Sequence, residues 1–191
     1  MSFKENYQKF VSFLNEDSWY SFFVSLILIV IVIKFVFFPV LAFVTGTSLP
    51  LVVVESCSMY HDSSFNLWWD ESRGWYENKE IDKTDFESYS FKNGINKGDI
   101  IFVVGDKNIE KGEVIIFIGG TKYPIIHRVV SIDFLSTKGD NNNDQLPGGI
   151  EQNIDSNKVL GRAVFRVPYL GWVKLIFFDF FKPIDQRGFC K

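Results

Sequence analysis

The sequence predicts a mainly β domain preceded by one N-terminal transmembrane helix. Residues 22–44 form a predominantly apolar stretch with a single charge, Lys34, and a single proline, Pro39, and about 20 such residues are enough to span the hydrocarbon of a bilayer. Beyond this stretch, short apolar runs bounded by turn residues recur between residues 48 and 170 with little helical periodicity. A chain of 191 residues has room for one core of ordinary domain size, so we expect a single folded domain behind the helix.

The segment before the apolar stretch, residues 1–21, is amphipathic. Phe3, Tyr7, Phe10 and Leu14 recur at helical spacing between charged residues, which predicts a short helix lying on a membrane surface. The apolar stretch itself exceeds the 7–15 apolar residues of a cleaved signal peptide, and its leading arm has mixed charge. We therefore interpret residues 22–44 as an anchor that is retained.

The expected strands of the β domain are apolar and rich in β-branched residues. They cover residues 51–54, 100–104, 114–118, 124–130 and 159–167. Two of them follow similar turns, Lys97-Gly98-Asp99 and Lys111-Gly112-Glu113, in which glycine permits a tight reversal before the chain enters the core.

Two segments depart from this pattern. Residues 61–96 are polar and charged but contain several aromatic residues, including Trp68, Trp69 and Trp75, which predicts an ordered insertion that folds as a lid or cap. We favour packing of these tryptophans onto the β domain over a position among lipid headgroups. The tail, residues 171–191, is apolar but too charged for a second span, which favours attachment at the membrane interface.

Composition excludes several classes of protein. The net charge of -3, with both signs mixed along the chain, excludes the basic surface typical of nucleic-acid binding. Two cysteines, Cys57 and Cys190, exclude a disulfide framework by count. The spacing of Cys57 and His61 gives only half of a zinc site, so no metal is expected. The concentration of phenylalanine near both ends of the chain indicates a lipid environment.

The residues that carry chemistry follow one another in a suggestive order. Ser58 comes directly after an apolar strand close to the anchor, and a serine becomes a nucleophile only when a base removes its proton. The two histidines are His61 and His127, and the loop after the strand of His127 contains Asp140 and Asp144. Serine, histidine and acid form the catalytic triad of serine hydrolases. The competing interpretation is a buried structural histidine followed by an ordinary solvated turn.

Six short motifs occur in series along the chain. They are Ser-x-Ser-Met at 56–59, Lys-Gly-Asp at 97–99, Ile-His-Arg-Val at 126–129, Lys-Gly-Asp-Asn-Asn at 138–142, Gly-Arg-Ala at 161–163 and Val-Pro-Tyr-Leu-Gly at 167–171. In this order they closely resemble type I signal peptidases, in the archaeal and endoplasmic-reticulum branch. The resemblance covers the chain from the anchor to Gly171 and implies a coiled, barrel-like β catalytic domain.

The resemblance assigns roles to individual residues. Ser58 matches the nucleophile and His127 the base, while the Ser56 hydroxyl and the Ser58 N–H match the groups that bind the oxyanion. The acid is less clear because the loop is about two residues shorter than in relatives. We choose Asp144, with Asp140 as the alternative. No cofactor and no metal are implied.

The function implied is that of a membrane-bound serine endopeptidase that removes N-terminal signal peptides from secretory and membrane preproteins. The expected partners are these preproteins, the lipid bilayer and the protein translocation machinery. The catalytic domain is expected on the extracytoplasmic side of the cell membrane, or in the endoplasmic reticulum membrane in a eukaryote. The long insertion favours a single-chain enzyme of the archaeal type.

Several alternatives stay open at this stage. His61 replaces a proline of the family and is a rival base, although a residue three positions after the serine points away from its hydroxyl. A Ser-Lys dyad would use Lys138 or Lys122, but both lie in polar turns, whereas such a base needs a desolvated lysine. Arg128 either contacts the loop that carries Asp140 and Asp144 or forms a structural salt bridge. An inactive membrane-anchored accessory subunit of a signal peptidase-like complex is the alternative outside enzymes.

Overall fold

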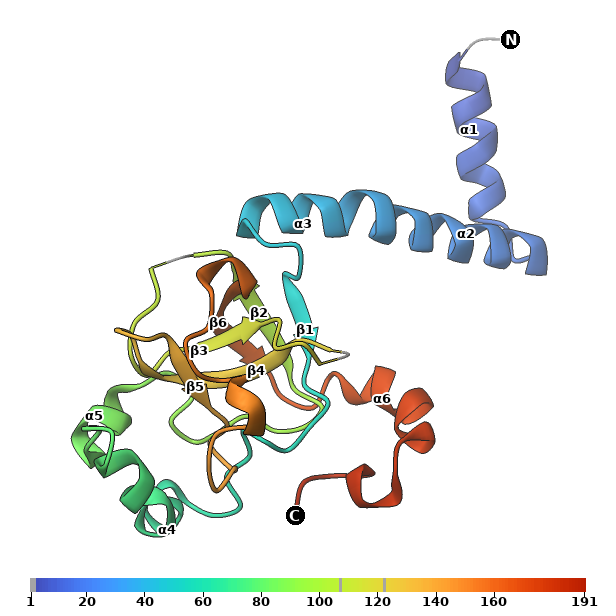
Figure 1. Ribbon diagram of the computed structural model, residues 1–191. Coiled ribbons are helices and arrows are strands. Elements are labelled where there is room, and N and C mark those ends of the chain that lie inside the picture. The colour runs from blue at the N-terminus through green and yellow to red at the C-terminus, as the bar shows by residue number, and fades with distance from the viewer. Residues whose placement is uncertain (1–2, 107, 122) are drawn as a thin grey trace. The chain divides into compact units, whose positions relative to one another are not determined.

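The computed structural model describes residues 3–106, 108–121 and 123–191, apart from the side chain of Asp185. The chain divides into two compact units, Met1–Val44 and Thr45–Lys191 (Figure 1).

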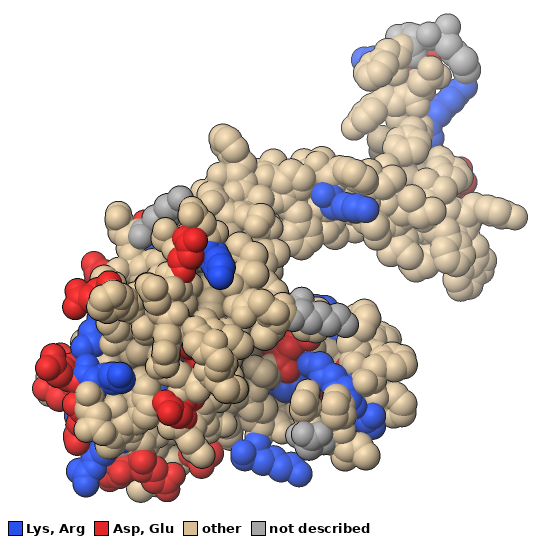
Figure 2. Space-filling model, viewed as in Figure 1, with Lys and Arg blue, Asp and Glu red and all other residues tan. Residues whose placement is uncertain are grey.

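In the described residues of the N-terminal unit, the regular elements are all helices. Its elements are α1 (Phe3–Leu14), α2 (Trp19–Val32), the π-helix η1 (Ile33–Phe37) and α3 (Phe38–Thr45). The Ser18 hydroxyl caps α2 by accepting a hydrogen bond from the Ser21 N–H, which fixes the start of this helix. The continuous stretch Trp19–Thr45 has a mean hydropathy of 3.0, and by length and composition it is able to cross a membrane. Its surface is almost free of charge (Figure 2).

The π-helical turn has a local cause. Pro39 lacks an N–H, and its ring would clash with a carbonyl of the preceding turn in a regular α-helix. The wider turn Ile33–Phe37 is closed by a hydrogen bond from the Phe38 N–H to the Ile33 carbonyl, five residues back. This widening lets an apolar helix pass a proline while its neighbouring backbone groups keep partners, as a bilayer requires.

The second unit is built on one antiparallel sheet. Its strands are β1 (Leu51–Val53), β2 (Ile100–Val104), β3 (Val114–Phe117), β4 (Ile125–Ser131), β5 (Ser136–Lys138) and β6 (Val159–Val167). Their order across the sheet is β1-β2-β6-β3-β4-β5. The register shifts in the pairings of β2 with β6, of β3 with β6 and of β4 with β5, and such bulges bend and twist a sheet. The predicted fold class, a mainly β domain after an N-terminal helix, is confirmed.

The insertion adds two helices, α4 (Phe65–Glu77) and α5 (Lys83–Ser88). Apolar residues of α4 share one face at helical spacing, and α5 begins with a reciprocal capping box between Asp82 and Asp85. Trp68 and Trp69 are buried together with Phe86 and with Val130 of β4. The prediction that these tryptophans pack onto the β domain is therefore confirmed.

The tail contains α6 (Trp172–Phe178) and two 3₁₀ turns, Asp179–Phe181 and Ile184–Gln186. It lies at the opposite end of the sheet from α4 and α5 (Figure 1). Its end is joined to the start of the domain by a disulfide between Cys57 and Cys190, with the two Cα atoms 5.6 Å apart. Counting cysteines excluded a framework of several disulfides, and this single pairing was not predicted.

Candidate active site

The segment that carries Ser58 leaves the edge of the sheet at β1. Val54 is fixed in this position, because its N–H donates to the Asp99 carbonyl at 2.9 Å and its carbonyl accepts from the Gly98 N–H at 2.8 Å. The chain then turns, and the fully buried Met59 side chain packs into the core. Ser58 is thus held on a tight turn between an anchored strand and an anchored methionine.

The hydroxyl groups of Ser56 and Ser58 lie side by side. Their oxygen atoms are 3.2 Å apart, and either one can donate the hydrogen bond. Ser56 is exposed and Ser58 is partly buried, so a substrate carbonyl approaching from solvent would meet both. The role of Ser56 as an oxyanion donor stays a prediction, and its position beside Ser58 is compatible with it.

The Lys-Gly-Asp-Asn-Asn loop, residues 138–142, closes over Ser58. The Asn141 N–H donates to the Ser58 carbonyl at 2.8 Å, and the Asn141 side chain donates to the Cys57 carbonyl at 3.1 Å. A Cβ atom added at Gly139 would lie 2.7 Å both from His127 Nε2 and from the Ser58 carbonyl. Only glycine leaves room here. Because both atoms lie next to Gly139, the structure brings Ser58 and His127 to one site. No hydrogen bond joins their side chains within the described part of the chain.

The acid that contacts His127 is Glu151, which the sequence analysis did not consider. Its carboxylate accepts a hydrogen bond from His127 Nδ1, which leaves Nε2 facing the loop and the nucleophile segment. The same carboxylate accepts from the Thr137 hydroxyl at 3.1 Å and from the Leu146 N–H. Glu151 is fully buried, and His127 is 2% exposed. A buried carboxylate held by three donors fixes both the tautomer and the orientation of the imidazole.

The predicted acid, Asp144, lies elsewhere. It is exposed and accepts a hydrogen bond from Trp75 Nε1 at 2.9 Å, and no contact with His127 is present among the described residues. The hydrogen bond from Trp75, and then that from the Gln145 N–H, lower the pKa of Asp144 below its usual value. The geometry therefore disagrees with the choice of Asp144 as the partner of the histidine.

The alternative acid, Asp140, belongs to a different buried network. Arg128 donates to it through Nε at 2.9 Å and Nη2 at 2.7 Å, and the Tyr76 hydroxyl donates at 3.1 Å. His61 Nε2 lies 3.1 Å from the same carboxylate, and its ring stacks on Trp68 with centroids 3.6 Å apart. Burial alone would raise the pKa of Asp140, but Arg128 holds it well below its usual range. Arg128 thus contacts the acid loop and also forms a structural salt bridge.

Side chains along β4 point alternately to the two faces of the sheet, which explains why Glu151 contacts His127 whereas Asp140 contacts Arg128. Arg128 is paired with Lys138 of β5, and Val130 packs into the cluster beneath α4 and α5. His127 and Val129 therefore point to the other face of the sheet, where Glu151 lies. Since Asp140 is bound to Arg128, it is on the insertion side of the strand. His61 is held on that side as well, which argues against its being a rival base.

We expect Asp140→Asn to destabilise the domain rather than to act on chemistry. It would leave Arg128 as a buried charge without its anion, a loss of roughly 3–5 kcal/mol in the free energy of unfolding. Thermal unfolding of the full chain in detergent should show a large decrease in Tm, while the cleavage rate per folded molecule is retained. Asp144→Asn, at an exposed position, is the matched control and should leave Tm nearly unchanged. Equal effects of the two variants would contradict this assignment.

Lys138 is not in a solvated turn, which corrects the argument that was used against a Ser-Lys dyad. It is 1% exposed, and its ammonium lies 4.9 Å from the ring centroid of Tyr76 and 5.1 Å from that of Trp75. Burial lowers its pKa to about 8, against the opposing effect of nearby carboxylates. A lysine with this pKa is a feasible base, but it points toward the insertion and away from the face of His127. The other lysine considered, Lys122, lies outside the described residues.

The pKa of Lys138 predicts an unusual pH dependence of stability. The folded pKa, about 8, is lower than the unfolded value of about 10.4, so between these limits the unfolded chain binds more protons. The free energy of unfolding should therefore rise with pH in this window, by at most about 1.4 kcal/mol per pH unit. Melting curves at pH 7.5 to 10 should show this rise, and Lys138→Met should abolish it. Lys92→Met, at an exposed lysine, should leave the rise intact; a rise that persists in Lys138→Met rejects the explanation.

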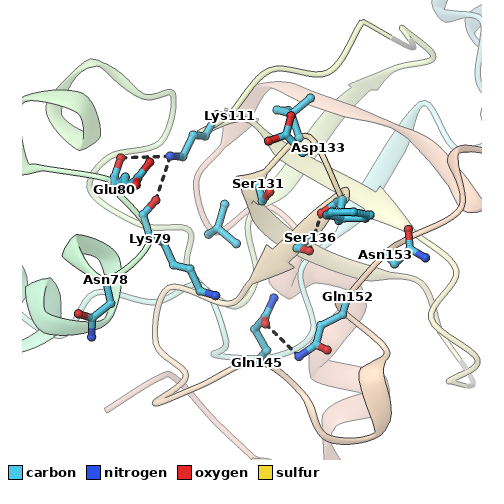
Figure 3. A pocket seen from close by; sticks show the side chains of 13 residues that line it. Asn78, Lys79, Glu80, Lys111, Ser131, Asp133, Ser136, Gln145, Gln152 and Asn153 are labelled. Atoms are coloured by element: carbon cyan, nitrogen blue, oxygen red, sulfur yellow. Dashed lines mark hydrogen bonds between the residues drawn. The ribbon is translucent and has the colours of Figure 1, made fainter.

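A cavity of about 780 Å³ lies between the end of α4, the β4–β5 hairpin and residues 145–153 (Figure 3). Gln145 crosses its wall and donates to the carbonyls of Thr137 and Glu151, at 2.7 and 3.3 Å. Gln152 donates in turn to Gln145 at 3.2 Å (Figure 3). The walls of this cavity do not include Ser58 or His127. Its polar side chains brace the loop that carries Glu151.

Glu151 was not predicted because it lies beyond the turn that follows the histidine strand, on a segment with no motif of its own. The signal that would have pointed to it is the run Pro147-Gly148-Gly149, which reverses the chain just after Asp144. The reversal brings the chain back along β5, where the Thr137 N–H donates to the Glu151 carbonyl at 3.0 Å. The acid therefore comes from the returning segment.

The chain was compared with known protein families and with curated proteins. No family model matches the chain. The curated relatives include the signal peptidase complex catalytic subunit SEC11C of human, dog and mouse, each 33% identical over 107 residues. The aligned part is 49% of this chain and 55% of each relative, so the chain spans about half the length of the curated relatives it matches. Over that part, the chain is a homologue of SEC11C, the catalytic subunit of the signal peptidase complex.

Proposed function

We propose that this protein is a membrane-bound serine endopeptidase that removes N-terminal signal peptides from preproteins. The observation that carries the proposal is the convergence of Ser58, His127 and the buried carboxylate of Glu151 at one site. The homology to a signal peptidase catalytic subunit supports the substrate class. The apolar stretch Trp19–Thr45 supports attachment to the membrane from which such substrates emerge.

The proposed chemistry is covalent serine catalysis. Ser58 Oγ attacks the scissile carbonyl carbon while His127 Nε2 takes the hydroxyl proton, and Glu151 orients the imidazole through Nδ1. The Ser56 hydroxyl and the Ser58 N–H donate to the oxygen that becomes negative. His127 then returns the proton to the leaving amine, and water, activated by the same histidine, hydrolyses the acyl-enzyme. No cofactor takes part in this scheme.

The proposed setting follows from the anchor. The domain begins directly after the apolar helix, so it works at a membrane surface, on the extracytoplasmic side where signal peptides are presented. The bilayer, the emerging preproteins and the translocation machinery are the proposed partners. The membrane is that of the endoplasmic reticulum for a eukaryotic chain, and the cell membrane for an archaeal one.

The test is cleavage of a purified preprotein by the full-length protein in detergent. We expect a single cut at the signal junction after a small residue, identified by the mass and N-terminal sequence of the product, and no cut by Ser58→Ala. A preprotein variant with bulky residues before the junction is the substrate control and should stay intact. A wild type that binds the preprotein without cutting it would replace the proposal with the accessory-subunit alternative.

A further inference from the structure

The residue just before the nucleophile is covalently tied to the end of the chain. Cys57 forms a disulfide with Cys190, 133 residues away in sequence. The Cys57 carbonyl also accepts a hydrogen bond from the Asn141 side chain, in the loop 138–142. The residue next to Ser58 is therefore held at its side chain by the tail and at its backbone by the loop.

A second tether joins the tail to the same segment. The Lys182 ammonium donates to the Glu55 carbonyl at 3.0 Å and lies 3.4 Å from the Glu55 carboxylate, while Lys174 of α6 donates to that carboxylate at 3.0 Å. Partial burial alone would raise the pKa of Glu55, but Lys174 and Lys182 bring it below the usual value. Glu55 and Cys57 thus flank Ser56 with contacts to the tail on both sides.

The tail is itself braced on the turn that anchors β1. Lys97 is buried, and its ammonium contacts the Asp179 carboxylate at 2.6 Å and the Gln186 carbonyl at 2.7 Å. Trp172 donates to the Lys97 carbonyl at 3.2 Å. Its indole ring lies so close to Gly98 that a Cβ there would be 2.2 Å from it. Because Gly98 also holds Val54, the tail and the nucleophile strand share one support.

We propose that the C-terminal tail is a positioning clamp for the nucleophile, closed by the Cys57–Cys190 disulfide and by the Lys182 contacts to Glu55. Neither element touches the reacting atoms, so their effect on chemistry is exerted through the position of Ser58. Disulfides persist in oxidising compartments and are rare in the cytosol, so the clamp closes only on the extracytoplasmic side. The inference rests on the proposed function and adds that cleavage depends on the redox state of this cysteine pair.

The test compares preprotein cleavage by the wild type before and after dithiothreitol, which reduces the disulfide to two thiols and is itself oxidised to a cyclic disulfide. We expect reduction to lower kcat by roughly 10- to 100-fold with little change in KM, because a shift of the nucleophile by about 1 Å has an effect of this size. Reoxidation should restore the rate. The double variant Cys57→Ser/Cys190→Ser should be slow from the start and should not respond to dithiothreitol.

The second tether gives a variant that leaves the disulfide intact. Lys182→Met should also lower kcat, while Phe178→Ser, at an exposed tail position that is 57% accessible, should not. Rates are normalised to the folded fraction measured by circular dichroism. If the loss equals the loss of folded protein, or if the reduced enzyme cleaves at the wild-type rate, the clamp is rejected. If the oxidised wild type does not cleave at all, the proposed function fails first, so the two failures are distinguishable.

Discussion

His127→Ala is expected to lower kcat for preprotein cleavage by about 10⁶-fold, as far as Ser58→Ala does, because the members of a catalytic unit fail together. For the same reason, the double variant should be no slower than either single variant. The structural basis is that His127 Nε2 and the Ser58 carbonyl both lie next to Gly139, in the loop 138–142. The measurement is single-turnover cleavage, with rates normalised to folded protein.

A control variant for misfolding is needed because the His127 side chain is buried. His127→Gln retains most of the volume and a hydrogen-bonding group toward Glu151, so its Tm should stay close to that of the wild type while the activity is still lost. Activity that survives both substitutions would require another base. Lys138, with its pKa of about 8, is then the group to test, and loss of cleavage in Lys138→Met would favour the Ser-Lys dyad.

The fold was predictable where local pattern and tertiary packing agree. The ranges 100–104 and 159–167 were predicted as strands and are observed as β2 and β6, because both are apolar runs rich in β-branched residues between turns. The strand β5 was not predicted, since Ser136–Lys138 is short and polar and is fixed only by its pairing with β4. The helices of the insertion were missed as well, although one face of α4 is aromatic.

The candidate site was predictable in part. Ser58 and His127 were singled out from the order of their motifs, and the structure brings them together. The carboxylate that contacts His127, Glu151, was not predicted, because a carboxylate can reach the same imidazole from the turn or from the returning chain, and spacing alone does not distinguish the two. The burial of Lys138 was also missed, since its cover comes from Trp75 and Tyr76, more than sixty residues earlier in the sequence.

Glu151→Gln is expected to lower kcat by about 10⁴-fold, the effect of neutralising the acid that orients a catalytic histidine. The glutamine keeps the volume and one oxygen, so it can accept from only one of the two groups, His127 Nδ1–H or the Leu146 N–H, and it presents a donor to the other. The imidazole is then held in the wrong tautomer or in the wrong orientation. A purely structural role would lower Tm without changing the rate per folded molecule, so the two effects are measured together.

Asp144→Asn is the matched control, since it removes the acid that the sequence analysis selected. Its carboxylate is exposed and bound to Trp75, so the variant should cleave within about two- to threefold of the wild type, as surface substitutions away from the chemistry do. The conservative variant Glu151→Asp should recover part of the activity lost in Glu151→Gln, because it restores the charge although it shortens the reach. If instead Asp144→Asn is inert and Glu151→Gln is active, the loop must rearrange when substrate binds, and the acid is the aspartate after all.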